Sequence, residues 1–80
     1  MTNLLDLKSG ETGVVLNVLT DIDLKQRLRD IGFIKGTEVQ FLHSSPTGDP
    51  RAYKLKSTIV ALRNGDAKNI IITKQSDNYE

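Results

Sequence analysis

Five short stretches of β-branched or alternating apolar residues fall within a chain of only 80 residues. Each is shorter than a typical buried helix, and each is bounded by polar or turn-forming residues. These stretches predict strands at residues 11–19, 38–43, 51–56, 58–63 and 70–73. Because an open sheet edge exposes unpaired backbone groups, so many short strands favour one small sheet that curls into a barrel. The chain is therefore expected to be mainly β, with a single core.

The segment between the first two predicted strands contains the signals for one helix. Thr20–Asp23 supply side-chain acceptors for the free backbone N–H groups of a helix start. Apolar residues then recur at the spacing of one helical face, at Leu24, Leu28 and Ile31. Gly32 can adopt the backbone conformation that ends a helix, which lets Phe33 fold back onto Leu28. We expect the helix to cover one open end of the barrel.

Two acid-base pairs in the same segment lie four residues apart, with the acid first. They are Asp21 with Lys25 and Asp23 with Arg27. This order stabilises an exposed helix by about 0.2 to 0.5 kcal/mol per pair, so two surface ion pairs are predicted.

Short turns are predicted near both ends of the chain. Asn3 can cap a single turn that places Leu4 and Leu7 in the core, and residues 64–67 form a break before the last strand. The last strand, a β-branched run at residues 70–73, is expected to be buried largely on both sides. Residues 1–74 are thus expected to form one SH3-like five-stranded barrel, and residues 75–80 a polar, disordered tail.

Composition excludes several functions. Eleven Lys and Arg against ten Asp and Glu give a net charge of +1, which is too small for charge-driven nucleic-acid binding. No apolar run approaches the roughly 20 residues that span a bilayer, so direct membrane insertion is not expected. The chain has no cysteine, which excludes disulfides and thiolate chemistry and agrees with a reducing cytosol.

No cluster of reactive side chains can be recognised. The single histidine, His43, falls at a strand end beside ordinary loop serines, and only scattered acids such as Asp49 and Asp66 could join it. A catalytic triad or a transition-metal site needs more groups than these. Phosphate-binding glycine motifs are also missing. We expect a protein that is not an enzyme and that has no cofactor and no stable metal site.

One alternative is a small barrel that binds nucleic acid. Phe41 and Tyr53 could stack on bases beside the cations Arg51, Lys54 and Lys56. The near-neutral charge and the expected burial of Phe41 favour a solvated face instead. Nucleic acid is therefore not the expected partner, although the alternative stays open.

The segment Arg27–Gly36, which reads RLRDIGFIKG, resembles a signature of the ferrous iron transport protein A family (FeoA). That signature, R-L-x-x-[IL]-G-[FLM]-x-x-G, joins a helix to a strand. Three further segments agree with the family: Leu7-x-x-Gly10 with Gly13, the loop at residues 46–50, and residues 59–63 followed by Asp66-Ala67. Together they span most of the chain. One departure is Ser57, which stands in the turn between the third and fourth predicted strands, where relatives often carry glycine.

The resemblance implies a cytoplasmic SH3-like protein that assists ferrous iron uptake without catalysis. It implies as partner the membrane permease FeoB, whose cytosolic part includes a GTPase domain and could recruit this chain to the inner face of the membrane. Self-association and direct contact with iron are left open. The residues expected to bind the partner are Leu24, Lys25, Arg27, Leu28, Arg29, Gly32 and Phe33. Local structure also explains several of them, because Leu28 suits a core position and the glycine suits a helix end.

Overall fold

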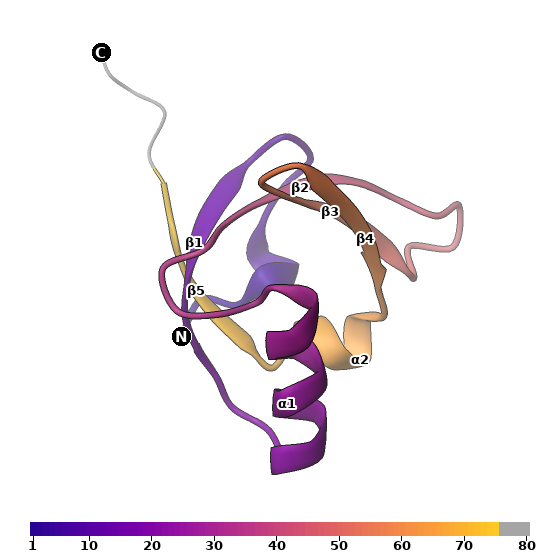
Figure 1. Cartoon of the computed structure of the whole chain (residues 1–80). Coiled ribbons are helices and arrows are strands. Elements are labelled where there is room, and N and C mark those ends of the chain that lie inside the picture. Colours follow the sequence, from indigo (N-terminus) through magenta and orange to yellow (C-terminus); the bar gives the residue numbers. More distant parts are fainter. Residues whose placement is uncertain (76–80) are drawn as a thin grey trace.

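The five β-rich stretches form one antiparallel sheet with strand order β4-β3-β2-β1-β5. The structure is a computed structural model that describes residues 1–75. In chain order the elements are η1 (Leu4–Asp6), β1 (Thr12–Val18), α1 (Ile22–Ile31), β2 (Glu38–Ser44), β3 (Arg51–Leu55), β4 (Thr58–Leu62), α2 (Asn64–Ala67) and β5 (Ile70–Lys74). The sheet curls around the core, and α1 lies at one open end of it (Figure 1). The predicted SH3-like, mainly β architecture with one helix between the first two strands is confirmed.

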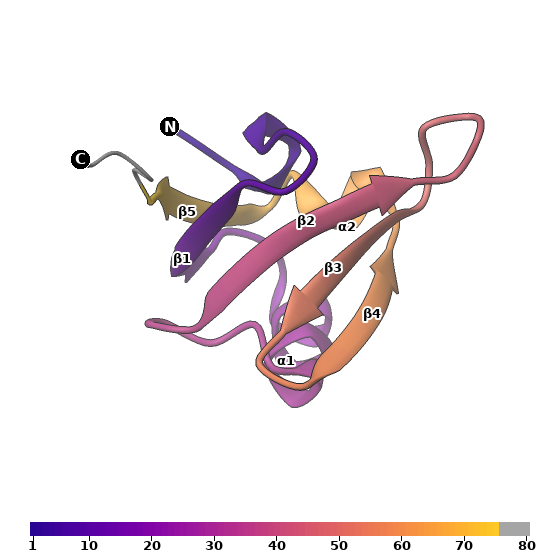
Figure 2. The same ribbon diagram turned by 90° about the horizontal axis from the view of Figure 1, so that it is seen from above.

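The core lies between the β5–β1 side of the sheet and the β3–β4 side, which face each other across it (Figure 2). It consists of alternate strand residues together with side chains from η1, α1 and α2. Its fully buried larger side chains are Tyr53, Phe33, Leu4, Leu28, Ile70, Ile72, Val15 and Val39. Among the described residues no polar or charged residue other than Tyr53 belongs to this core. A core this small makes each buried side chain important for stability.

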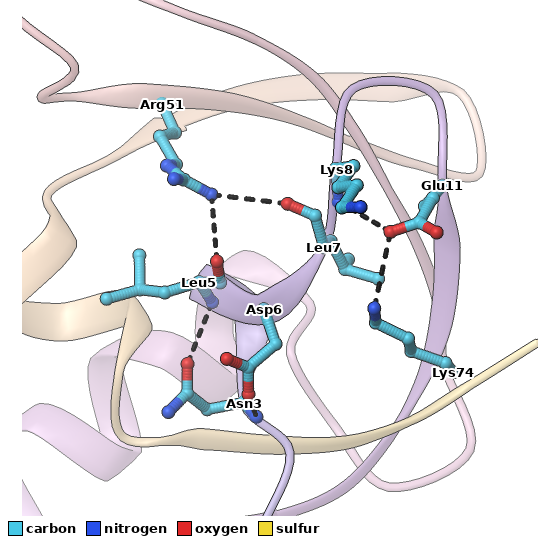
Figure 3. A network of polar contacts seen from close by, with 8 residues as sticks. All are labelled: Asn3, Leu5, Asp6, Leu7, Lys8, Glu11, Arg51 and Lys74. Carbon is cyan, nitrogen blue, oxygen red and sulfur yellow. Dashed lines mark hydrogen bonds and ion pairs between the residues drawn. The ribbon is translucent and has the colours of Figure 1, made fainter.

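The N-terminal turn η1 packs into the core, as the sequence predicts. The Asn3 side chain accepts a hydrogen bond from the Leu5 N–H at 2.8 Å, and the Asp6 carboxylate accepts one from the Asn3 N–H at 2.9 Å. Arg51 on β3 holds this turn in place, because its Nη1 donates to the carbonyl oxygens of Leu5 and Leu7 at 3.3 and 3.4 Å (Figure 3). The N-terminal turn is thus tied to the start of β3.

Glu11 joins the start of β1 to β5. Its carboxylate accepts a hydrogen bond from the Lys8 N–H at 2.6 Å and lies 3.5 Å from the Lys74 ammonium (Figure 3). The Lys8 N–H, and after it the positive charge of Lys74, lower the pKa of Glu11. This is the only ion pair within residues 1–75.

The last strand, β5, is less buried than its sequence predicts. Ile70 and Ile72 point into the core, but Ile71 is only half-buried, so the expectation of burial on both sides is wrong. The reason is position: β5 is an edge strand that pairs with β1 alone. Its outer edge is covered by the N-terminal segment, where the Ile72 N–H donates to the Thr2 carbonyl at 2.9 Å.

Helix α1 starts and stops where the sequence predicts. Asp21 caps it by accepting a hydrogen bond from the Leu24 N–H at 2.9 Å. At the other end Gly32 has φ 131°, and the N–H of Phe33 donates to the Leu28 carbonyl at 2.9 Å. This bond, together with one from Gly32 to Arg29, forms a Schellman motif. It turns Phe33 into the core.

Two expectations about α1 are wrong. The sequence pattern places Ile31 on one apolar helical face with Leu24 and Leu28. Ile31 is 45% exposed, however, because the chain turns at Gly32 and Phe33 enters the core in its place. The ion pairs of Asp21 with Lys25 and of Asp23 with Arg27 do not form, since the described residues hold only the Glu11 pair. Asp21 is used as the cap instead.

The remaining turns refine the sequence prediction. Strain in the β3–β4 turn lies at Lys56, which has φ 41°, rather than at Ser57. The predicted break before β5 is the four-residue helix α2, and Ala67 in it is fully buried. Gln75 donates its N–H to the Thr12 carbonyl at 2.9 Å, so this first residue of the expected tail is held by the sheet. The rest of that tail, residues 76–80, lies outside the described residues.

The burial of Tyr53 leads us to expect that the stability of the protein falls at alkaline pH. Its side chain is fully buried and its Oη has no hydrogen-bond partner. Burial raises the pKa of Tyr53, and the nearby charge of Arg51 offsets only part of that effect. The unfolded chain therefore ionises this tyrosine near the usual pKa of about 10, before the folded chain does, and stability falls as pH rises above that value.

Tyr53→Phe removes both the buried hydroxyl and this titration. We expect urea unfolding curves of the variant to equal or exceed those of the wild type at neutral pH, with an increasing advantage above about pH 10. An advantage that stays constant between neutral and alkaline pH would contradict the assignment to Tyr53.

Candidate protein-interaction surface

Helix α1 divides its exposed side chains between two flanks. Leu28 faces the core, and successive residues advance by about 100° around the helix. Lys25 and Arg29, one turn apart, lie on the flank beside β1. Arg27 shares the opposite flank with Ile31, which lies beside the β3–β4 turn. The two arginines therefore point to different sides of the helix.

A groove of about 360 Å³ lies between α1 and β1, and we call it the α1–β1 groove. Its floor is apolar and is formed by the buried residues Val15, Val18 and Phe33. Leu16 and Ile34 line it as well, and they are 46% and 48% exposed. An exposed apolar pair above an apolar floor is a feature of surfaces that bind other molecules.

The charged residues that line the α1–β1 groove are all basic. They are Lys25, Arg29 and Lys35. None of them forms an ion pair within residues 1–75. The groove therefore combines an apolar floor with uncompensated positive charge.

Leu16 reaches the groove because β1 contains a bulge. The pairing of β1 with β5 moves from Val15 opposite Ile72 directly to Asn17 opposite Ile71, so Leu16 is an extra residue in the strand. A bulge of this kind interrupts the inward and outward alternation of side chains. Leu16 and Asn17 are consequently both exposed, although they are neighbours.

The structure brings together only part of the predicted partner-binding set. Lys25, Arg29 and Phe33 line the α1–β1 groove, and Phe33 does so from a fully buried position. Leu28 is also buried, and it supports the surface from below. Arg27 lies on the other flank, where it is exposed.

The other two predicted residues lie at the edges of this surface. Leu24 is half-buried and packs against the core. Gly32 is half-buried and lines a second hollow next to the β3–β4 turn.

Four exposed groove residues were missed by the sequence analysis: Leu16, Asn17, Ile34 and Lys35. One signal could have revealed the first of them. Val14, Val15 and Leu16 are consecutive apolar residues, which breaks the alternation of a half-buried strand and is compatible with a bulge. Ile34 and Lys35 follow the helix stop and carry no local signal for a groove.

The single histidine does not belong to a cluster of metal ligands among the described residues. His43 is exposed at the end of β2, where it lines a hollow with prolines and alanines. Across residues 1–75 no three His, Asp or Glu side chains lie close enough together to hold a metal ion. That same part of the chain contains no helix with the length and apolar character needed to cross a membrane.

The two aromatic rings on which the nucleic-acid alternative depends are buried. Phe41 is 6% exposed and Tyr53 is fully buried, and the two rings pack against each other with centroids 5.5 Å apart. Arg51 lies over the Phe41 ring at 4.5 Å. Lys54 is exposed, but neither aromatic ring is available beside it for a base to stack on.

Comparison with known proteins assigns the chain to a family. The model of the FeoA domain matches residues 2–74. This chain belongs to the FeoA family. A Campylobacter jejuni protein that is named as an Fe(2+) transport protein A is 34% identical to this chain over 65 residues. These residues cover 81% of this chain and 88% of that protein. The resemblance read from the sequence is confirmed.

Solved FeoA structures share the fold. The solution structure of the FeoA protein from Chlorobium tepidum superposes with a TM-score of 0.88 at 24% identity, covering 98% of this chain and 74% of that one. The crystal structure of FeoA from Stenotrophomonas maltophilia, complexed with zinc, superposes with a TM-score of 0.79 at 30% identity. The match covers 90% of this chain and 89% of that one. That protein is described as a procaryotic SH3 domain protein and as a candidate activating factor for ferrous iron transport.

Proposed function

We propose that this FeoA-family chain is a non-catalytic accessory protein of ferrous iron uptake. It acts in the cytoplasm by binding the cytosolic part of a FeoB-type permease, which recruits it to the inner face of the membrane. The observation that carries this proposal is the family match over residues 2–74. An exposed surface on α1 that combines apolar and basic side chains supports it, because such a surface suits a protein partner.

The partner-binding surface that we propose is centred on α1. Leu24, Lys25, Arg27 and Arg29 are the members of the predicted set with exposed or half-exposed side chains. Of these, Lys25 and Arg29 line the α1–β1 groove and are the contact candidates, whereas Arg27 lies on the opposite flank. Leu28, Gly32 and Phe33 determine how the helix is placed against the barrel.

A pull-down from membranes tests the partner directly. The chain serves as bait for membranes that contain a FeoB-type permease, with guanine nucleotide present or absent. We expect the permease to be retained in at least one nucleotide state, and membranes without the permease provide the control. No retention in either state would contradict the proposed partner.

Reversing the charges of α1 tests the surface. We expect Arg27→Glu combined with Arg29→Glu to raise the Kd for the permease's cytosolic domain at least about tenfold, because rim charges steer and orient a partner. The circular dichroism spectrum should not change, since both side chains are exposed.

A matched control is Lys54→Glu combined with Lys68→Glu. It changes the net charge equally, and both lysines are exposed and outside α1. Equal weakening by the two double variants would show that binding responds to total charge and not to the α1 surface.

A further inference from the structure

We propose that the α1–β1 groove binds an acidic segment of the permease's cytosolic part that also carries an apolar side chain. The apolar side chain lies between Leu16 and Ile34, above the floor of the groove. Carboxylates next to it pair with Lys25, Arg29 and Lys35. This inference rests on the proposed function and specifies the chemistry of the segment that is recognised.

The positive charges around the groove indicate that the partner segment is negatively charged. Lys25, Arg29 and Lys35 line it, and no acidic residue does. The acids of α1 that follow its cap, Asp23 and Asp30, do not line the groove. They lie roughly 140 to 160° around the helix from Lys25 and roughly 100 to 120° from Arg29. A segment with carboxylates would meet a positive potential that the chain itself does not neutralise.

The apolar residues of the groove indicate that the partner segment also carries an apolar side chain. Leu16 and Ile34 approach half exposure while the residues beneath them are buried. The β1 bulge displaces Leu16 from the regular alternation of the strand, so its exposure is built into the fold. A purely ionic partner would leave this apolar surface in water, whereas an aliphatic or aromatic side chain would cover it.

The two flanks of α1 provide a matched pair of variants. Arg29→Glu changes a groove residue, and Arg27→Glu makes the same change two residues away on the opposite flank. Both side chains are exposed and neither forms an ion pair within residues 1–75. Any difference between these variants in binding therefore reports which flank contacts the partner.

The first experiment is calorimetric titration of the permease's cytosolic domain with the full chain. We expect Arg29→Glu and Lys25→Glu each to raise the Kd about tenfold or more, Leu16→Asp to raise it similarly, and Arg27→Glu to change it less than about threefold. Melting curves identify any variant that fails to fold. If Arg27→Glu weakens binding as much as Arg29→Glu, or if Arg29→Glu binds like the wild type, the groove is not the site.

The second experiment separates this inference from the proposed function. The labelled chain is titrated with a short peptide of glutamates and leucines, and with its counterpart in which lysines replace the glutamates. We expect amide NMR shifts at Leu16, Ile34 and Arg29 with the acidic peptide only. Shifts with both peptides, or with neither, would overturn the groove assignment. If the acidic peptide produces these shifts while the permease domain fails to bind, the proposed partner is wrong and the groove specificity stands.

Discussion

Leu28→Ala should lower the free energy of unfolding by about 2 to 5 kcal/mol, the largest effect that we expect from a single substitution. Leu28 is 1% exposed and is the only residue of α1 that is fully buried in the core. Removing its side chain leaves a cavity under the helix, and nearby groups relax only partly to fill it. Because domains of this size are only marginally stable, the variant should be largely unfolded at moderate urea concentrations. Urea unfolding followed by circular dichroism measures the change.

Ile31→Ala is the matched control on the same helix. Ile31 is 45% exposed, so its truncation removes little buried apolar surface and should cost less than about 1 kcal/mol. If the two variants lose equal stability, the placement of α1 on the barrel is wrong.

Gly32→Ala should be the second most damaging change, with a loss of about 1 to 3 kcal/mol. Gly32 has φ 131°, a backbone conformation that residues with a Cβ rarely adopt. An added Cβ would also lie 3.2 Å from Cδ1 of Leu55, which is tighter than ordinary packing. The same residue directs Phe33 into the core, so the strain should spread to the start of the segment that lines the groove. Thermal and urea unfolding both report the loss.

Gly65→Ala is the control for this second prediction. Gly65 lies in α2, its φ is not in the left-handed region, and apart from its chain neighbours and the helix's own backbone no heavy atom lies within 4 Å of an added Cβ. Alanine is the better helix former, so stability should be unchanged or should rise by up to about 1 kcal/mol. A loss equal to that of Gly32→Ala would indicate a general cost of added side chains and not the helix end.

Features that depend on neighbouring residues could be predicted from the sequence. The cap at Asp21, the stop at Gly32 and the return of Phe33 to the core depend on hydrogen bonds within a few residues, so the order of residue types was sufficient. The same holds for the cap at Asn3. The five strands could also be located, because each is a local run of β-branched or alternating apolar residues, although their hydrogen bonds join distant segments. The signature around Arg27–Gly36 identified the family for the same reason, because it is contiguous.

Features that depend on distant segments could not be predicted. Ile71 is half-exposed because β5 is an edge strand next to β1, and the residue pattern does not specify strand order. The bulge that exposes Leu16 arises where β1 and β5 pair out of step, across more than 50 residues of chain. The α1–β1 groove exists only after a strand, one flank of the helix and the segment behind Gly32 have packed together. The arginines at 27 and 29 look equivalent in the sequence, and packing of Leu28 against the core assigns them to different sides of the molecule.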